Sequence, residues 1–157
     1  MKRILYIALI IVAAGVLAQA QEAKQETKAE KTAKEYIADL SSGADEKTII
    51  EAEQWLGNKK EKEAVPGLIN LLNDKRDTVR MEAAIALGLI GEESAADALN
   101  NSLLNDASAE VRYAALLATM RVGSKKSVEA YKQSKEKDSD PFIQDLLGKI
   151  EAKAKSK

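Results

Sequence analysis

The chain repeats one stretch of its own sequence at a fixed interval. Residues 74–91 read DKRDTVRMEAAIALGLIG, and residues 106–123 read DASAEVRYAALLATMRVG. The two stretches align without a gap at an offset of 32, which places Asp74 on Asp106 and Gly91 on Gly123. A fixed period between about 20 and 50 residues is typical of proteins built from stacked repeats. Such proteins generally work by presenting a surface, so the repeat favours an interaction protein over an enzyme.

Each copy reads as two helices joined by a short polar turn. Residues 63–73 and 95–105 carry apolar residues at helical spacing and are expected to form the first helices of the two clear copies. Residues 79–90 contain an apolar stripe at i, i+4, i+8 and i+11, which predicts an amphipathic second helix. Asp77 or Thr78 is expected to cap its start, and Gly91 and Gly123 are expected to end the two second helices in a left-handed conformation.

Two fainter copies flank the clear ones. Residues 50–57 echo residues 81–88 at an offset of 31, with a leading helix expected over 35–40. At the other end, residues 127–135 and 138–150 would form a fourth pair. Terminal repeats that meet solvent on one side usually depart from the pattern of the inner ones. The sequence therefore predicts an all-α fold of about eight helices in four pairs.

Three segments carry a family resemblance: residues 64–74, 77–80 and 83–91. They resemble HEAT repeats, and more closely the short HEAT-like repeats of phycobilisome lyases. The resemblance implies a short right-handed α-solenoid of about four HEAT-like helix pairs, with the second helices on the concave side. It also implies a structural ladder of hydrogen bonds between repeats, made by Asp74 with Arg80 and by Asp106 with Arg112. Gln144 replaces the arginine in the last copy, so the ladder is expected to weaken there.

The first twenty residues predict a secretory signal. Lys2 and Arg3 precede an apolar run over residues 4–17, and Ala18-Gln19-Ala20 fits a cleavage site. We therefore expect an exported protein, periplasmic or secreted. An uncleaved anchor is the alternative, although the run is shorter than the roughly 20 apolar residues of a membrane-spanning helix.

The rest of the chain divides by composition. Residues 21–34 alternate Glu and Lys without a large apolar residue, which is typical of a charged linker. Residues 35–152 would form the repeat domain and residues 153–157 a basic tail. With Lys+Arg 24 against Asp+Glu 25, the chain lacks the basic balance expected of a nucleic-acid binder.

The residues that most often perform chemistry are missing. The sequence contains no His and no Cys, which removes histidine bases, thiolate nucleophiles and the usual zinc ligands. No glycine-rich phosphate loop occurs, and Asp138-Ser139-Asp140 has too few ligands for a calcium loop. We accordingly predict no catalytic, cofactor-binding or metal-binding residues.

The positions outside the predicted core hold the candidate site. On the second helices of the two clear copies they recur at i, i+4 and i+8, and five of the six are apolar or aromatic: Met81, Ile85, Leu89, Tyr113, Leu117 and Arg121. Side by side, the two stripes would form an apolar patch of the kind that marks interaction surfaces. Arg121, with Lys149 at the equivalent place in the last copy, would favour an acidic partner. Packing of the stripes into the core, or contact with a second copy of the chain, are the alternatives.

The function predicted on this basis is an exported, non-enzymatic scaffold or adaptor that binds a protein or peptide on its concave face. A cofactor-handling accessory protein, as in the lyases, is one alternative, and a structural spacer without a specific partner is another. We expect a monomer or weak homodimer with no stable membrane insertion after signal cleavage. Trp55, where the later copies have Ala86 and Ala118, is expected to fill the open end of the core.

Overall fold

The computed structural model describes residues 31–41 and 43–155. The predicted signal segment and residues 21–30 of the predicted linker lie outside these residues. The described α-helices are α2 (Ala33–Asp39), α3 (Glu46–Lys59), α4 (Val65–Leu71), α5 (Asp77–Ile90), α6 (Ala96–Asn105), α7 (Ala109–Val122), α8 (Ser127–Lys137) and α9 (Pro141–Lys155). Two short 3-10 turns, Lys62–Ala64 and Glu93–Ala95, lead into α4 and α6.

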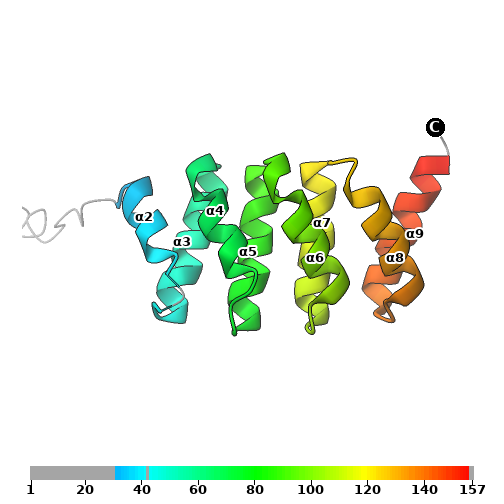
Figure 1. The fold of residues 1–157 in the computed structure, drawn as a ribbon, viewed down its shortest axis with the longest axis horizontal. Coiled ribbons are helices and arrows are strands. Elements are labelled where there is room, and N and C mark those ends of the chain that lie inside the picture. Colours follow the sequence, from blue (N-terminus) through cyan, green and yellow to red (C-terminus); the bar gives the residue numbers. More distant parts are fainter. Residues whose placement is uncertain (1–30, 42, 156–157) are drawn as a thin grey trace, which may run out of the picture. The chain divides into compact units, whose positions relative to one another are not determined.

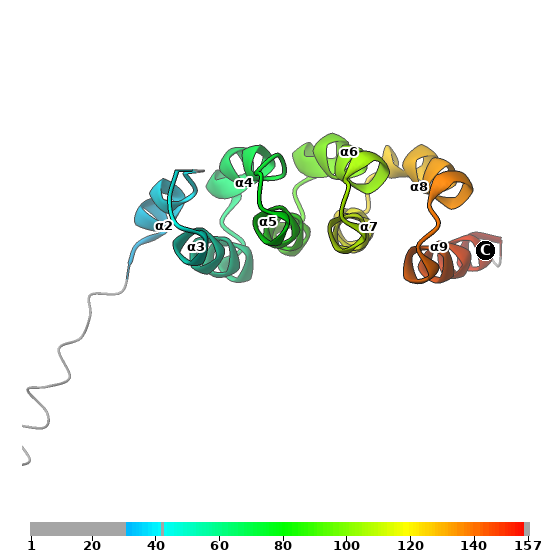
Figure 2. The same ribbon diagram turned by 90° about the horizontal axis from the view of Figure 1, so that it is seen from below.

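The helices of residues 32–155 stack in two layers. Figure 1 shows the helix pairs following one another along the sequence. Figure 2 shows that the two helices of each pair lie in different layers. The first helices α2, α4, α6 and α8 form one layer, which we call the first-helix layer. The second helices α3, α5, α7 and α9 form the second-helix layer. The predicted all-α solenoid of four helix pairs is confirmed.

The domain ends differ slightly from those expected. Helix α2 begins at Ala33, inside the predicted linker, because Thr32 and Glu35 form a capping box that stabilises the first turn. Helix α9 continues to Lys155 rather than ending at residue 152. A hydrogen-bonded ion pair between Lys155 and Glu151, four residues apart, supports this last turn at 2.6 Å.

The helix ends of the clear repeats follow the sequence in part. Gly91 and Gly123 end α5 and α7 with φ of 78° and 68°, as predicted. The expected cap of α5 was wrong, because Arg76 is the N-cap and makes no side-chain capping bond. Its backbone N–H instead donates to the carboxylate of Asp74 at 2.9 Å, so the turn aspartate orders this connection.

The core lies between the two layers and runs through all four pairs. Val79, Ala83 and Leu87 of the predicted stripe are completely buried. At the N-terminal end Trp55 is half-buried and its ring stacks on Tyr36 of α2, with the ring centroids 4.4 Å apart. Trp55 thus packs against the core of the first pair.

Two glycines set the spacing within the second-helix layer. A Cβ at Gly57 of α3 would lie 2.9 Å from the Cα of Ala86 on α5. A Cβ at Gly88 of α5 would lie 2.8 Å from the Cα of Ala118 on α7. Both distances are too short for a real contact, and the neighbouring atom is backbone that cannot move aside alone. The glycines therefore permit the close approach of α3 to α5 and of α5 to α7.

One carboxyl group is buried in the core of the first two pairs. Glu53 of α3 is completely buried, and neither carboxyl oxygen has a hydrogen-bond partner among the described residues. Loss of hydration, followed by the nearby carboxylates of Glu82 and Asp74, raises the pKa of Glu53 to about 9. Glu53 is accordingly an uncharged acid at neutral pH.

The spacing of the second-helix layer can be tested with two Gly→Ala variants. Gly88→Ala should lower the free energy of unfolding by about 1–3 kcal/mol, because the new methyl group forces α5 and α7 apart. A Cβ at Gly148 of α9 would have the Nζ of Lys135 as its nearest heavy atom, 3.6 Å away. Gly148→Ala should therefore stabilise the protein by up to about 1 kcal/mol through helix propensity. Urea unfolding of both variants measures this, and equal stability of the two would contradict the argument.

The burial of Glu53 predicts a dependence of stability on pH. The folded pKa of about 9 lies above the ordinary value of 4.5, so the folded state holds a proton that the unfolded state releases between these values. The contribution of Glu53 to stability is therefore fully present below pH 4.5 and falls as pH rises to 9, by at most about 1.4 kcal/mol per pH unit. Unfolding measured from pH 5 to 9 should show this loss in the parent relative to Glu53→Gln.

A matched control is Glu51→Gln, which removes an exposed carboxylate from the same helix. Its pH profile should run parallel to that of the parent. Parallel profiles for the parent and Glu53→Gln would show that the buried acid is not protonated in the folded state.

Candidate interaction surface

The six predicted site residues lie on the outer face of the second-helix layer. Met81, Ile85 and Leu89 are on α5, and their counterparts on α7 are Tyr113, Leu117 and Arg121. Ile85 and Leu117, at the middle of the two stripes, are 40% and 39% exposed. Met81, Leu89 and Tyr113 are half-buried, and Arg121 is exposed. We call these six residues the α5–α7 patch.

The neighbouring helices present polar side chains at the equivalent positions. On α3 the residues in register with Ile85 and Leu89 are Gln54 and Asn58, both exposed. On α9 the residues in register with Leu117 and Arg121 are Lys149 and Lys153, also exposed. The apolar part of the outer face thus centres on the two middle repeats, and Ile50 of α3 extends it at the position in register with Met81. Uncharged polar groups lie beyond it on α3, and Asp145 with two cations lies on α9.

Met120 adds an exposed apolar side chain beside the patch. It stands in register with Gly57 and Gly88, whose missing side chains let adjacent second helices approach. With methionine at this place, α7 packs against α9 more loosely than against α5. Met120 is consequently 41% exposed. Met120 was not among the predicted site residues, although the replacement of the repeated glycine by methionine could have indicated it.

The four predicted ladder residues lie at the turns between the helices of a pair, but the predicted pairing was wrong, because each arginine binds the carboxylate of the following repeat and only the carbonyl oxygen of its own turn aspartate. The Nε and Nη2 atoms of Arg80 donate to the carboxylate of Asp106 at 2.8 and 2.9 Å, and Nη1 donates to the carbonyl oxygen of Asp74 at 2.9 Å. Arg112 makes the same bonds to the carboxylate of Asp138, at 2.8 and 3.1 Å, and to the carbonyl of Asp106, at 3.0 Å. Each arginine therefore binds its own repeat through a carbonyl and the next repeat through a carboxylate.

The two ends of the ladder are built differently. At the first junction Arg76 pairs with Asp74 of its own turn and reaches back to the carbonyl of Ala44 at 3.1 Å. At the other end Gln144 donates to the carbonyl of Asp138 at 2.7 Å, the bond that arginine makes in earlier repeats. The sequence reading did not identify Arg76, because its counterparts are Ser108 and Asp140 and the repeat carries no signal there.

The ladder carboxylates are ionised by their surroundings. The hydrogen bond from Arg76 lowers the pKa of Asp74 to about 2. Burial raises the pKa of Asp106, but the hydrogen bonds from Arg80 and from the backbone of Ser108 hold it below the ordinary value. The hydrogen bond from Arg112 likewise lowers the pKa of Asp138. These groups are paired and charged, which fits a structural role.

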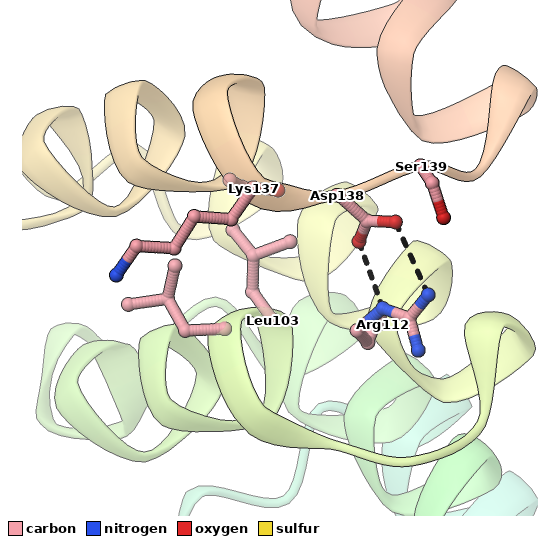
Figure 3. Close-up of a pocket in the computed structure, with 7 residues that line it drawn as sticks. Leu103, Arg112, Lys137, Asp138 and Ser139 are labelled. Carbon is pink, nitrogen blue, oxygen red and sulfur yellow. Dashed lines mark hydrogen bonds and ion pairs between the residues drawn. The ribbon is translucent and has the colours of Figure 1, made fainter.

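Two pockets accompany the ladder in register. One of about 210 Å³ lies beside the Arg112–Asp138 pair, with Lys137 and Ser139 at its edge (Figure 3). Another of about 310 Å³ lies beside the Arg80–Asp106 pair. The lining residues correspond at an offset of 32, for example Leu104 to Leu72 and Ser134 to Ser102. Since the pockets recur with the repeat, they belong to the way adjacent pairs stack.

An apolar groove of about 430 Å³ lies between α8 and α9. Val128, Tyr131, Leu147 and Ile150 supply most of its apolar lining. The residues in register on α6 and α7 include Leu99, Ala115 and Ala118, which are buried. The groove is the face on which a following repeat would pack, and the sequence reading did not single it out.

Neither a cluster of metal-ligating side chains nor a membrane-spanning helix is found among the described residues. Within residues 31–41 and 43–155, no three or more acidic side chains are placed to hold a metal ion. Across the same residues, no helix has the length and apolar character needed to cross a membrane.

A protein-family model described as HEAT repeats matches residues 33–120, which is more than half of the chain. The match begins at the first residue of α2 and ends within α7. No curated protein matches the chain.

Proposed function

The chain belongs to the HEAT repeat family, and we propose that it is a non-enzymatic scaffold or adaptor that holds a protein or peptide on the α5–α7 patch. HEAT repeats are generally scaffolds for protein interactions. The match is to HEAT repeats in general, so the closer likeness to the repeats of phycobilisome lyases stays a prediction.

The observation that carries the proposal is the exposure of large apolar side chains at equivalent positions on two adjacent helices. Ile85 and Leu117 are 40% and 39% exposed in the middle of the patch. Leaving such side chains in water forgoes roughly 1 kcal/mol or more of burial energy each, which a bound partner would recover. The core residues of the same helices are buried and the ladder residues Arg80 and Arg112 are half-buried, so fold stability does not require apolar residues at Ile85 and Leu117.

The alternatives predict different behaviour of the same residues. If the stripes were part of the core, Ile85 and Leu117 would be covered by other parts of the chain, whereas they are exposed among the described residues. A homodimer would bury the patch against a second copy. A spacer would need no apolar patch at all.

Export belongs to the proposal as well. The basic start, the apolar run and Ala18-Gln19-Ala20 support it. The binding experiment therefore starts from expression of the full-length chain. The mass of the exported protein shows whether residues 1–20 have been removed. A protein that begins at Gln21 supports export, and intact residues 1–20 in a cytoplasmic protein contradict it.

The scaffold proposal is tested by capture of partners from envelope extract with the parent protein and with an Ile85→Asp, Leu117→Asp double variant. The variant should keep its helical circular dichroism, because both positions are partly exposed. It should lose at least about tenfold in the amount of partner captured, because two buried, unpaired carboxylates would each cost several kcal/mol in the complex.

Val128→Asp is the matched control, since Val128 is exposed but lies on α8, outside the patch. It should capture the same partner as the parent. Unchanged capture by the double variant would refute the proposal, as would unfolding of that variant. A parent dimer that the double variant abolishes, without any other partner, would assign the patch to self-association.

A further inference from the structure

The outer face of the second-helix layer changes in charge along the repeats. Position by position, α3 presents Ile50, Gln54 and Asn58, and α9 presents Asp145, Lys149 and Lys153. Arg121 is the exposed last residue of the stripe on α7. At these register positions of the described helices, the cations therefore lie at the C-terminal side of the α5–α7 patch, on α7 and α9.

The cations lie next to the apolar side chains. Helices α7 and α9 are in contact, and Lys149 on α9 stands in register with Leu117 on α7. Met120, 41% exposed on the α9 side of α7, connects the apolar patch with this edge. The two parts of the surface are thus adjacent enough for one ligand to cover both.

The present partner of Lys149 is replaceable. Its Nζ lies 2.6 Å from the carboxylate of Asp145, and the two side chains are 70% and 63% exposed. An ion pair this exposed contributes little to stability. A carboxylate brought by a ligand whose apolar part is already bound would desolvate the site and form a stronger contact.

We propose that the α5–α7 patch takes a protein segment that carries apolar side chains toward one end and carboxylates toward the other. The apolar side chains pack on Ile85 and Leu117, and the carboxylates reach Arg121, Lys149 and Lys153. This inference rests on the proposed function and adds the chemistry of the bound segment. The side chains of Gln54 and Asn58 at the opposite edge are uncharged, so the two edges of the surface differ in charge.

A protein segment fits this surface better than an anionic membrane. Membrane surfaces attract clusters of four or more basic residues. Here the acidic side chain of Asp145 lies among the cations, and the chain as a whole has a formal net charge of −1.

The test is selection of binding peptides from a phage-displayed library of random 12-residue peptides, with the protein purified after expression of the full-length chain. Recovered peptides should combine apolar residues with Asp or Glu toward one end. Their synthetic copies should bind a Lys149→Glu, Lys153→Glu variant at least about tenfold more weakly than the parent, a loss of about 1.4 kcal/mol or more. Their affinity for the parent should fall with added salt.

A charge-matched control is Lys34→Glu, Lys75→Glu, which changes the net charge equally but alters exposed residues on α2 and in the turn after α4. Its affinity should stay within about twofold of the parent at physiological salt, where distant exposed charges are screened. Peptides without acidic residues, or peptides that bind the α9 variant as well as the parent, would overturn the inference and leave the scaffold proposal standing.

Two other outcomes would contradict the scaffold proposal as well. Recovery of no peptide, or of peptides that still bind the Ile85→Asp, Leu117→Asp variant, would remove the patch as a binding site. Binding to phosphatidylglycerol vesicles that the α9 variant abolishes, without any peptide bound, would assign the surface to a membrane and overturn both proposals.

Discussion

The contact between a turn aspartate and the arginine of the preceding repeat is the interaction on which the remaining structure depends. The carboxylates of Asp74, Asp106 and Asp138 each accept the backbone N–H two residues later at 2.9 Å, which fixes the turn between the two helices of a pair. Asp106 and Asp138 also receive two bonds from the arginine of the repeat before. One side chain thus sets both the shape of its own repeat and the position of its neighbour.

Because other residues stabilise the stack, the exposed residues on the outer face of the second-helix layer are not needed for folding. Apolar residues such as Val79 and Leu87 fill the interior, the ladder holds successive pairs in register, and Gly57 and Gly88 set the distance between adjacent second helices. Ile85 and Leu117, the most exposed apolar residues of the patch, have none of these roles, so the chemistry of their positions can vary from repeat to repeat. Variation along the array then produces a surface that is apolar in the middle and cationic at one edge.

Much of the fold follows from the sequence because the repeat constrains it several times over. The offset of 32, the apolar stripe and the C-terminal glycines each predict the same helix pairs. Contacts that involve one repeat only were harder to foresee. Arg76 and Glu53 have no equivalent in the other copies. The predicted N-cap of α5 was wrong because Arg76 holds that position and its N–H donates to Asp74. The stripe was visible as a pattern, but its exposure depends on how tightly α7 and α9 pack, which the sequence shows only indirectly at Met120.

A double-mutant cycle on Arg80 and Asp106 tests the central claim most directly. Arg80→Ala, Asp106→Ala and the double variant would be unfolded in urea and compared with the parent. The cycle cancels the turn bond that Asp106 makes to its own repeat and leaves the contact between repeats. A ladder that holds the pairs in register predicts a coupling energy of about 1.5 kcal/mol or more, as expected for charge-assisted, partly buried bonds. Single effects that simply add, within about 0.5 kcal/mol, would show that the repeats stack without it.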